Sequence, residues 1–264
     1  MSGFDKAWLA LREPADRRAR HGGLTEALSS YVRSLPDPLV LDIGCGTGST
    51  WRSLAGRLPA GARWLMLDND PLLLDEAARR IGRDAGVTFR RHDLADIDAL
   101  PLEGVGVVTA SALFDLCSEP FCAALADRLA SARCGLYAAL NYDGTMRWSP
   151  SHPLDAQMVA LFNSHQRTDK GFGPALGPDA AACLARHLAA RGFTVRVEDS
   201  PWHLDAESAE LQAQLLQGLR RPLLEISDLP EATVDGWLEY RLGAIGTPGG
   251  SGLVGHADLL ALPA

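Results

Sequence analysis

Short apolar runs alternate with helical segments over residues 39–142, and this alternation limits the fold more than any other feature. Unbroken apolar runs of about four to eight residues indicate strands buried on both faces of a sheet. Strands that alternate with helices form parallel sheets with right-handed crossovers. We therefore predict a doubly wound α/β fold. The runs are LVLDIG (39–44), ARWLMLD (62–68), VTFRRHD (87–93), VGVVTASAL (105–113) and CGLYAALNY (134–142).

Helical periodicity and end signals predict the helices around these strands. Pro71 opens and Gly82 closes a helix at 71–82, because proline fits the first helical position and glycine the residue after the last. Beyond residue 143 the alternation lapses. The other predicted helices are 4–20, 24–35, 48–58, 119–133, 153–165, 178–192, 206–220 and 230–243, and two further strands are 193–199 and 252–263.

The chain is long enough for one large α/β domain, and we expect a single domain over residues 1–264. Its expected parts are an N-terminal helical cover (1–36), a ligand-binding core (37–142), a cap or substrate segment (143–178) and a C-terminal part of the sheet with inserted helices (179–264).

The composition argues against several classes of protein. The formal net charge is −8, whereas phosphate binding needs a basic surface, so we expect no nucleic-acid partner. No apolar run approaches ~20 residues and the N-terminal segment lacks the features of a secretion signal, so we expect no membrane association and a cytoplasmic location. The five cysteines form no C-x-x-C pair and fit no zinc spacing, so we expect buried thiols and no metal.

The run VLDIGCGTGST, Val40 to Thr50, ends in a glycine-rich turn that lets a ligand approach the backbone closely. Its spacing differs from the dinucleotide fingerprint G-x-G-x-x-G, and it lacks the lysine of a phosphate-binding P-loop. Asp42 argues against a ligand that carries a pyrophosphate, because a carboxylate beside a pyrophosphate is repelled by roughly 1 to 4 kcal/mol at contact distance. The same carboxylate suits a ligand that has an ammonium group and no phosphate.

The stretch resembles the first motif, D/E-x-G-x-G-x-G, of class I S-adenosylmethionine (SAM)-dependent methyltransferases. The resemblance implies a Rossmann-like sheet of seven strands, mostly parallel, with an antiparallel last strand at 252–263. It implies that Asp68 holds the ribose hydroxyls and that Asp93 and the Leu94 backbone hold the adenine. The SAM-binding residues that it implies are Asp42, Gly44, Cys45, Gly46, Gly48, Asp68, Asn69, Asp93, Leu94 and Ser111.

Candidate residues for the methyl acceptor follow the fourth and fifth predicted strands. Asp115 comes just past the fourth strand, and Asn141, Tyr142 and Asp143 are predicted just past the fifth. Asp115 and Tyr142 are catalytic candidates and Asn141 is a substrate-binding candidate, while packing is the alternative role for Tyr142. A metal site of the catechol methyltransferase type is disfavoured, because the spacing of these acids and Asn141 does not reproduce that pattern.

The densest polar cluster of the cap segment lies in HQRTDKGFG, residues 165–173. His165 is a candidate base, and Arg167 and Lys170 are candidates to bind an anionic substrate. The alternative is a helix C-terminus with cations that complement its dipole. Trp202 and His203, predicted to follow the sixth strand, are candidates for a second wall of the substrate site.

Arg12 and Arg20 lie on the N-terminal helices, which often cover the SAM pocket in the family that the sequence resembles. One interpretation has an arginine there binding the carboxylate of SAM. We favour the other interpretation, in which both side chains are exposed helix charges.

The function that we predict is in-line methyl transfer from SAM to a small molecule, anionic if the cap cations bind it. A tRNA or rRNA methyltransferase is one alternative, although the fourth strand lacks the N/D-P-P-Y/F motif that stacks a flipped base. A SAM-binding regulatory protein without transfer activity is another. Asp42 and the glycine spacing disfavour an NAD(P)-dependent dehydrogenase.

Overall fold

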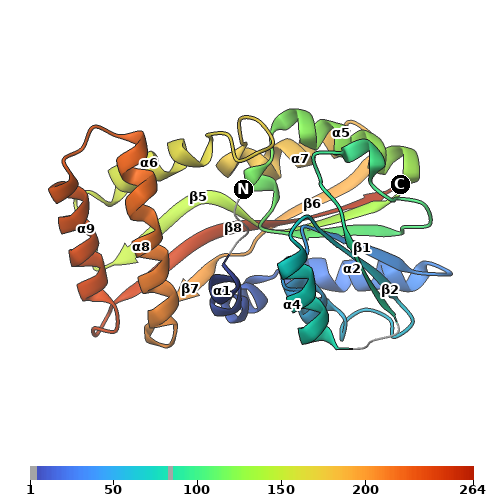
Figure 1. The fold of residues 1–264 in the computed structure, drawn as a ribbon, viewed down its shortest axis with the longest axis horizontal. Helices are drawn as coiled ribbons and strands as arrows, with labels where there is room; N and C mark the ends of the chain where they lie inside the picture. The colour runs from blue at the N-terminus through green and yellow to red at the C-terminus, as the bar shows by residue number, and fades with distance from the viewer. Residues whose placement is uncertain (1–4, 83–85) are drawn as a thin grey trace.

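A computed structural model of the chain describes residues 5–82 and 86–264 (Figure 1). Phe4, where the first helix was predicted to begin, lies outside the described residues. The described chain forms one mixed sheet with helices on both faces. Its eight strands are β1 (Leu39–Ile43), β2 (Arg63–Asp68), β3 (Val87–Arg91), β4 (Val107–Ser111), β5 (Gly135–Ser149), β6 (Phe193–Asp199), β7 (Trp202–Leu204) and β8 (Ser251–Pro263).

The strand order is β3-β2-β1-β4-β5-β8-β6, with β7 paired to β8. The pairs among the first five strands are parallel, whereas β8 runs antiparallel to β5, β6 and β7. The predicted Rossmann-like sheet with an antiparallel last strand is therefore confirmed. The sheet contains one strand beyond the seven that were predicted, the three-residue β7, which is too short to leave a periodic signal in the sequence. Trp202 and His203 follow β6, as predicted, and lie in β7.

The predicted helices are present in the described chain, and short 3₁₀ turns join several of them to the strands. The helix after the glycine turn is shorter than predicted and ends at Leu54. In the helix at 71–81, the Asp70 carboxylate accepts a hydrogen bond from the Leu72 N–H, as an N-cap does. The helices are α1 (Lys6–Ala19), α2 (Gly22–Ser34), α3 (Ser49–Leu54), α4 (Pro71–Ile81), α5 (Glu119–Ala132), α6 (Asp155–Gln166), α7 (Ala180–Ala189), α8 (Ala209–Ile226) and α9 (Glu231–Ala244).

Two apolar layers hold these helices against the sheet. Val40 and Leu41 are both fully buried, but they point to opposite faces because side chains alternate along a strand. Val40 packs with side chains of α2, α3 and α4, and Leu41 packs with side chains of α5 and α7. Burial on both faces explains the unbroken apolar runs of the central strands.

Strand β5 continues to Ser149, and this corrects its predicted end at residue 142. Asn141, Tyr142 and Asp143 therefore lie inside the strand rather than past it. The Asp143-Gly144 pair is an ordinary turn signal, but the chain forms bulges at this point and stays paired with β8. The extended β5–β8 pair supports a second lobe made by α6, α8, α9 and β7, on the left of Figure 1.

The helices of residues 5–82 and 86–264 include none with the length and apolar character needed to cross a membrane. All five cysteines are buried free thiols, as predicted.

Candidate cofactor and acceptor site

The glycine turn between β1 and α3 has a backbone that glycine alone adopts easily. Gly44, Gly46 and Gly48 have φ values of +61°, +53° and +83°. A Cβ on Gly48 would lie 2.8 Å from Ile81 Cδ1, at the end of a side chain that can shift, so the positive φ is what disfavours a side chain there. The turn is held against β2, because Cys45 N donates to Leu67 O at 2.9 Å and Gly46 N donates to Asp68 Oδ2 at 2.8 Å.

Asp42 lies beneath this turn and is fully buried. Its Oδ1 accepts a 2.6 Å hydrogen bond from Thr109 Oγ1, while its Oδ2 has no hydrogen-bond partner within the described chain. Burial raises the pKa of the Asp42 carboxyl to about 7. A buried carboxylate oxygen without a donor is costly, and a cationic ligand would offset that cost.

Arg20 lies on the same side of the turn, and it corrects the interpretation that we favoured for the N-terminal arginines. It is only 7% exposed, and the side chain of Arg12 is also largely buried. Arg20 Nη2 donates to Ser111 Oγ at 2.6 Å, and Ser111 Oγ lies 3.1 Å from Thr50 Oγ1. Among the residues that the structure describes, none accepts a hydrogen bond from Arg20 Nε or Nη1. The site thus offers a guanidinium with free N–H groups near a carboxylate with a free oxygen.

The acids after β2 and β3 are placed differently from each other. Asp68 is buried, and its oxygens accept hydrogen bonds from Gly46 N at 2.8 Å and Asp70 N at 3.0 Å. Asp93 is exposed and accepts from Ala95 N at 3.0 Å, whereas Leu94 is buried. Asn69 is exposed. Asp68 and the glycine turn therefore form one hydrogen-bonded unit, with Asp93 free to reach a ligand from the edge.

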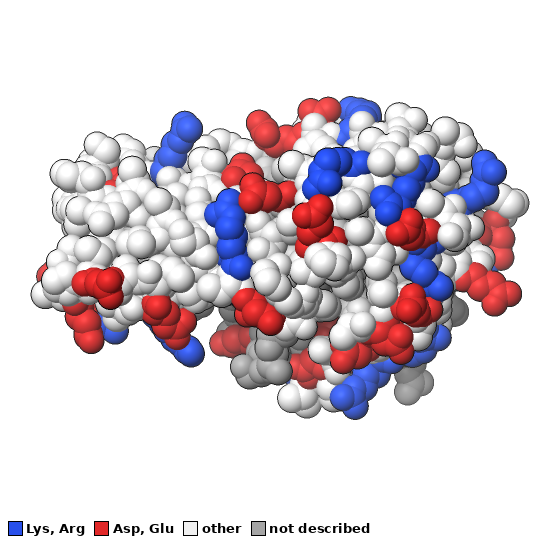
Figure 2. Space-filling view, turned by 90° about the horizontal axis from the view of Figure 1, so that it is seen from above, with Lys and Arg blue, Asp and Glu red and all other residues white. Residues whose placement is uncertain are grey.

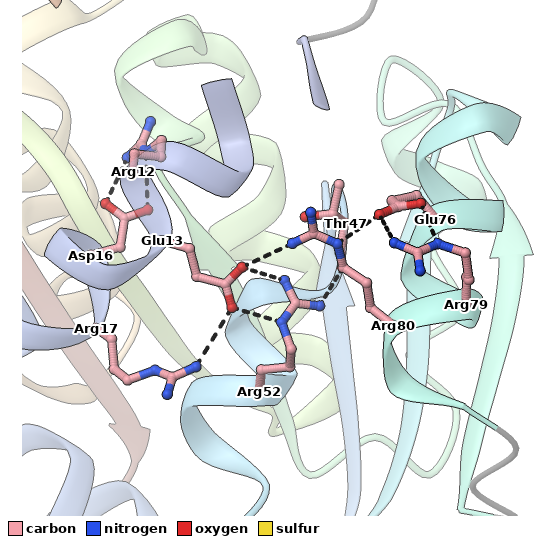
Figure 3. Close-up of polar contacts among 9 residues, drawn as sticks. All are labelled: Arg12, Glu13, Asp16, Arg17, Thr47, Arg52, Glu76, Arg79 and Arg80. Atoms are coloured by element: carbon pink, nitrogen blue, oxygen red, sulfur yellow. Dashed lines mark hydrogen bonds and ion pairs between the residues drawn. The ribbon is translucent and has the colours of Figure 1, made fainter. Parts of the chain in front are cut away.

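Helix α1 covers the turn and is fastened there by ion pairs (Figure 3). The Glu13 carboxylate accepts two hydrogen bonds from Arg52, at 2.6 and 2.7 Å, and one from Arg80 at 3.2 Å. Arg52 also donates to Thr47 O within the turn, at 2.6 Å. Leu9 of α1 lies against Gly46. These contacts connect α1 to α3 and α4 across the candidate ligand site.

The acceptor side of the site begins where β4 ends. Asp115 is 7% exposed, and no donor in the described part of the chain reaches its Oδ1. The Arg12 guanidinium lies 5.0 Å from the centre of the Trp202 ring, and Trp202 lies 4.9 Å from the ring of His256. Tyr142 is buried and donates to Asn163 Oδ1 at 2.9 Å. The structure thus brings Tyr142 and Trp202 together with His256, a residue that the sequence did not single out.

The polar residues of the cap segment form their own network at the surface. His165 Nε2 lies 3.1 Å from Glu225 Oε2, and Lys170 Nζ lies 3.3 Å from His165 Nδ1. Arg167 pairs with Asp179 at 2.9 Å. His203 is exposed on β7. A role for these four residues in substrate binding stays a prediction, and each of the three cap residues already has partners within the protein.

Three side chains outside this site have the residue types that bind metal ions. Glu119, Cys183 and His187 place ligand atoms within 4.8 Å of one another, although the sequence spacing did not suggest a metal. Arg186 Nη2 donates to Glu119 Oε1 at 2.9 Å and lies 3.6 Å from Cys183 Sγ. The guanidinium therefore takes the position between these atoms that a cation would need.

Residues 40–132 match the family model of a methyltransferase domain. Among curated protein sequences, none matches the chain. The matched segment runs from β1 to α5, with the glycine turn, Asp42 and Asp68 inside it.

Solved structures resemble the whole chain at low identity. The SAM-dependent methyltransferase from Geobacter sulfurreducens, in complex with S-adenosyl-L-homocysteine, is 16% identical with a TM-score of 0.50, and the match covers 100% of both chains. The cyclopropane synthase MmaA2 from Mycobacterium tuberculosis is 14% identical with a TM-score of 0.52, covering 98% of this chain and 94% of that chain. These matches show a methyltransferase fold.

A third structure is much longer than this chain. Phosphoethanolamine N-methyltransferase 2 from Haemonchus contortus is 16% identical with a TM-score of 0.48, and the match covers 92% of this chain. It covers 52% of that chain, so this protein spans about half the length of the Haemonchus enzyme.

Proposed function

We propose that this protein is a SAM-dependent methyltransferase that acts on a small molecule. The observation that carries the proposal is the buried pair of Arg20 and Asp42 beside the glycine turn. Arg20 has two nitrogens with free N–H groups and Asp42 has a free carboxylate oxygen, counted over the described residues. An amino acid that carries both a carboxylate and an ammonium group would satisfy both, and SAM has such an end.

The remaining residues of the turn fit the rest of SAM. Ser111, bonded to Arg20, would lie next to the amino-acid end. Asp68 would hold the ribose, since each of its oxygens accepts one backbone N–H and keeps a second lone pair. Asp93 and the Leu94 backbone would hold the adenine. The glycines of the turn would let SAM approach the backbone closely.

Bound SAM would supply a methyl group on a positively charged sulfur, which leaves as a neutral thioether. The protein therefore needs no strong acid, and its tasks are to place the acceptor and to exclude water. Helix α1, fixed by the Glu13 ion pairs, covers the turn and would exclude water from it. Asp115 is a buried group able to accept a proton from the acceptor.

Surface charge supports a small acceptor over a nucleic acid. The net charge is −8, and acidic and basic side chains are interspersed on the face seen in Figure 2. A nucleic-acid site needs a basic surface around the pocket. The buried position of Asp115 and Tyr142 also favours an acceptor small enough to enter beneath α1.

Calorimetry with SAM, S-adenosylhomocysteine and NAD tests the proposal. We expect both adenosyl compounds to bind and NAD not to bind. Binding of NAD without SAM would overturn the assignment. Turnover then separates the remaining classes: methylation of tRNA or rRNA would support the RNA-directed alternative, and binding of SAM to a protein that methylates nothing in broad substrate panels would support the regulatory alternative.

A further inference from the structure

We infer that the methyl acceptor is a neutral or cationic compound whose N–H or O–H group donates to Asp115 Oδ1, and that this carboxylate takes the proton released on methylation. The inference rests on the proposed function and names the acceptor class for the same site. It departs from the anionic acceptor that the cap cations suggested.

Asp115 is placed beside the glycine turn by the chain that follows β4. Ala112, at the start of this connection, has a φ of +49° and donates its N–H to Ala139 O at 2.9 Å. The next residue, Leu113, packs over Gly44. A non-glycine residue held at positive φ next to a ligand-binding turn is the kind of strain that accompanies functional sites. Asp115 follows two residues later and is buried with Oδ1 lacking a donor in the described structure.

The charged groups around Asp115 leave it able to act on a ligand. Arg12 of α1 and Tyr142 of β5 interact electrostatically with it from the packed elements, and Cys117 does so from its own segment. Arg12 is committed to Asp16, with contacts of 2.9 and 3.2 Å, and Asp16 also accepts from Trp202 Nε1 at 3.0 Å. With Arg12 neutralised by Asp16, the ionised Asp115 leaves this cluster with one net negative charge, which would repel an anionic acceptor.

Two other buried side chains, on β5 and β8, also present acceptor atoms. Asn141 is 1% exposed and uses its Nδ2 to donate to Ala138 O and Ala257 O, at 3.1 and 3.0 Å. These two carbonyls fix the amide orientation, so the Asn141 atom without a partner in residues 5–82 and 86–264 is an acceptor, Oδ1. His256, which is paired with Tyr142 across β5 and β8, has a buried Nδ1 also without a described partner. Burial lowers the pKa of His256 to about 3, so its ring is neutral and able to accept a hydrogen bond.

The proton has a suitable destination in this arrangement. Burial raises the pKa of the Asp115 carboxyl to about 6, which suits a general base near neutral pH. A neutral acceptor would use the lone pair of its nitrogen or oxygen to form the bond to the methyl carbon of SAM, and its N–H or O–H proton would pass to Asp115 Oδ1. A protonated amine would first give one N–H proton to Asp115 Oδ1, which frees the nitrogen lone pair for the same attack. In both cases the carbon–sulfur bond breaks with its electron pair remaining on sulfur.

Three probes with a common ring test the inference: benzylamine, benzyl alcohol and benzoate. Each is added to protein saturated with S-adenosylhomocysteine, and binding is followed by ligand-observed NMR. We expect the amine and the alcohol to bind at least about tenfold more tightly than benzoate, as removal of one charge-assisted hydrogen bond implies. Benzylamine affinity should rise as the pH passes through about 6, because Asp115 ionises there.

Asp115→Asn should remove both the preference for benzylamine and the rise of benzylamine affinity with pH. Asp127→Asn, at an exposed position of α5, should leave both unchanged. Preference for benzoate, binding by none of the probes, or a pH profile unaltered in Asp115→Asn would each overturn the inference. Calorimetry with S-adenosylhomocysteine on the same samples separates the two proposals, because its failure to bind wild-type protein would contradict the proposed function instead. The wild-type comparison of amine with benzoate needs no variant and stands if Asp115→Asn fails to fold.

Discussion

The backbone N–H of Leu140 donates a 2.8 Å hydrogen bond to Asp258 Oδ1, and Leu140 has a φ of +57°. The other oxygen of Asp258 accepts from Tyr137 Oη at 2.8 Å and from His21 N at 3.0 Å. One fully buried carboxylate therefore holds the β5 bulge before Asn141 and the start of α2 next to Arg20. It supports both halves of the candidate site from behind.

Replacing Asp258 should destabilise the fold. The substitution Asp258→Asn would keep one acceptor oxygen but turn an NH₂ group toward buried donors, and a buried donor left unsatisfied costs about 1–3 kcal/mol. We expect Asp258→Asn to lower the free energy of unfolding by about 3 kcal/mol in urea titrations, from the two donors affected. Asp127→Asn, which removes an exposed ion pair, should cost less than about 1 kcal/mol. Equal losses in free energy of unfolding for Asp258→Asn and Asp127→Asn would contradict the structural role of the Asp258 carboxylate.

Arg20 should matter both for SAM binding and for folding. We expect Arg20→Met to weaken SAM binding by about 10- to 100-fold, the loss of charge-assisted hydrogen bonds. The free protein should also lose thermal stability, because the nearby Tyr137, Asp258 and Asp16 outweigh the cost of burying the Arg20 guanidinium, and the variant leaves these buried carboxylates without their cation. Calorimetry and thermal unfolding measure the two effects, and the exposed Arg18→Met serves as control. A drop in stability without a change in affinity would contradict the assignment.

Asp42 should couple SAM binding to proton release. Its pKa of about 7 in the free protein means that part of the population is protonated at neutral pH. The positive groups of SAM favour the carboxylate, so binding should release protons near pH 7 and tighten as the pH rises from 6 to about 8. Calorimetry in buffers of different ionisation enthalpy measures the release. Asp42→Asn should abolish it, and release that persists in this variant would assign the proton to another group.

The same raised pKa has a consequence for stability in the absence of SAM. The folded-state pKa of Asp42 exceeds its ordinary value of 3.8, so its contribution to stability is present at low pH and lost as pH rises through about 7. Asp42→Asn should therefore reduce the loss in free energy of unfolding that wild type shows between pH 3.8 and about 7 in urea titrations.

Glu13 should act in the opposite direction. Burial alone would raise the pKa of its carboxyl, but Arg52, Arg80 and Arg17 outweigh that effect and hold it below 4.5. Its contribution to stability is therefore present above pH 4.5 and lost as the pH falls further. Glu13→Gln should be less stable than wild type at pH 7, with the difference shrinking in acid, and the exposed Glu26→Gln should show no such trend. A difference that is constant with pH would refute this role for the ion pairs.

Gly48 should disfavour a side chain because of its backbone conformation. Gly48→Ala would strain a φ of +83°, for a cost of about 1–2 kcal/mol, while the end of the Ile81 side chain can move away from the added methyl group. Gly218 in α8 has open space around it, so Gly218→Ala should stabilise the protein by about 0.5–1 kcal/mol. Chemical denaturation measures the free energy of unfolding of both variants. An equal loss in both would contradict the conclusion that the backbone of the glycine turn requires glycine.

Local signals made most of the core predictable from sequence. The β1 run, the glycine turn and the Asp70-Pro71 start of α4 depend on neighbouring residues, and the structure has each of them where it was predicted. The end of β5 depended on a distant partner, since β8 keeps pairing with residues past Asp143-Gly144. No local pattern reports such pairing.

The site was less predictable than the fold, for the same reason. Arg20 has the sequence context of a surface arginine, and its burial results from the packing of α1 and α2 over the sheet. His256 sits in an apolar strand and gains its surroundings from Tyr142 and Trp202, both distant in sequence. The polar residues of the cap form a conspicuous cluster in the sequence. In the structure, however, His165 pairs with Glu225 and Arg167 pairs with Asp179.

The β5–β8 pair spans both lobes, with β5 covering Gly135–Ser149 and β8 covering Ser251–Pro263. A hinge between the lobes would have to break this ladder and uncover the side chains packed on it. We expect ligand exchange to depend on α1 instead, because α1 is attached to the turn through ion pairs rather than strand hydrogen bonds. Since dissolved salt weakens such pairs where water reaches them, the rate of product release should increase with ionic strength while the sheet itself stays unaffected.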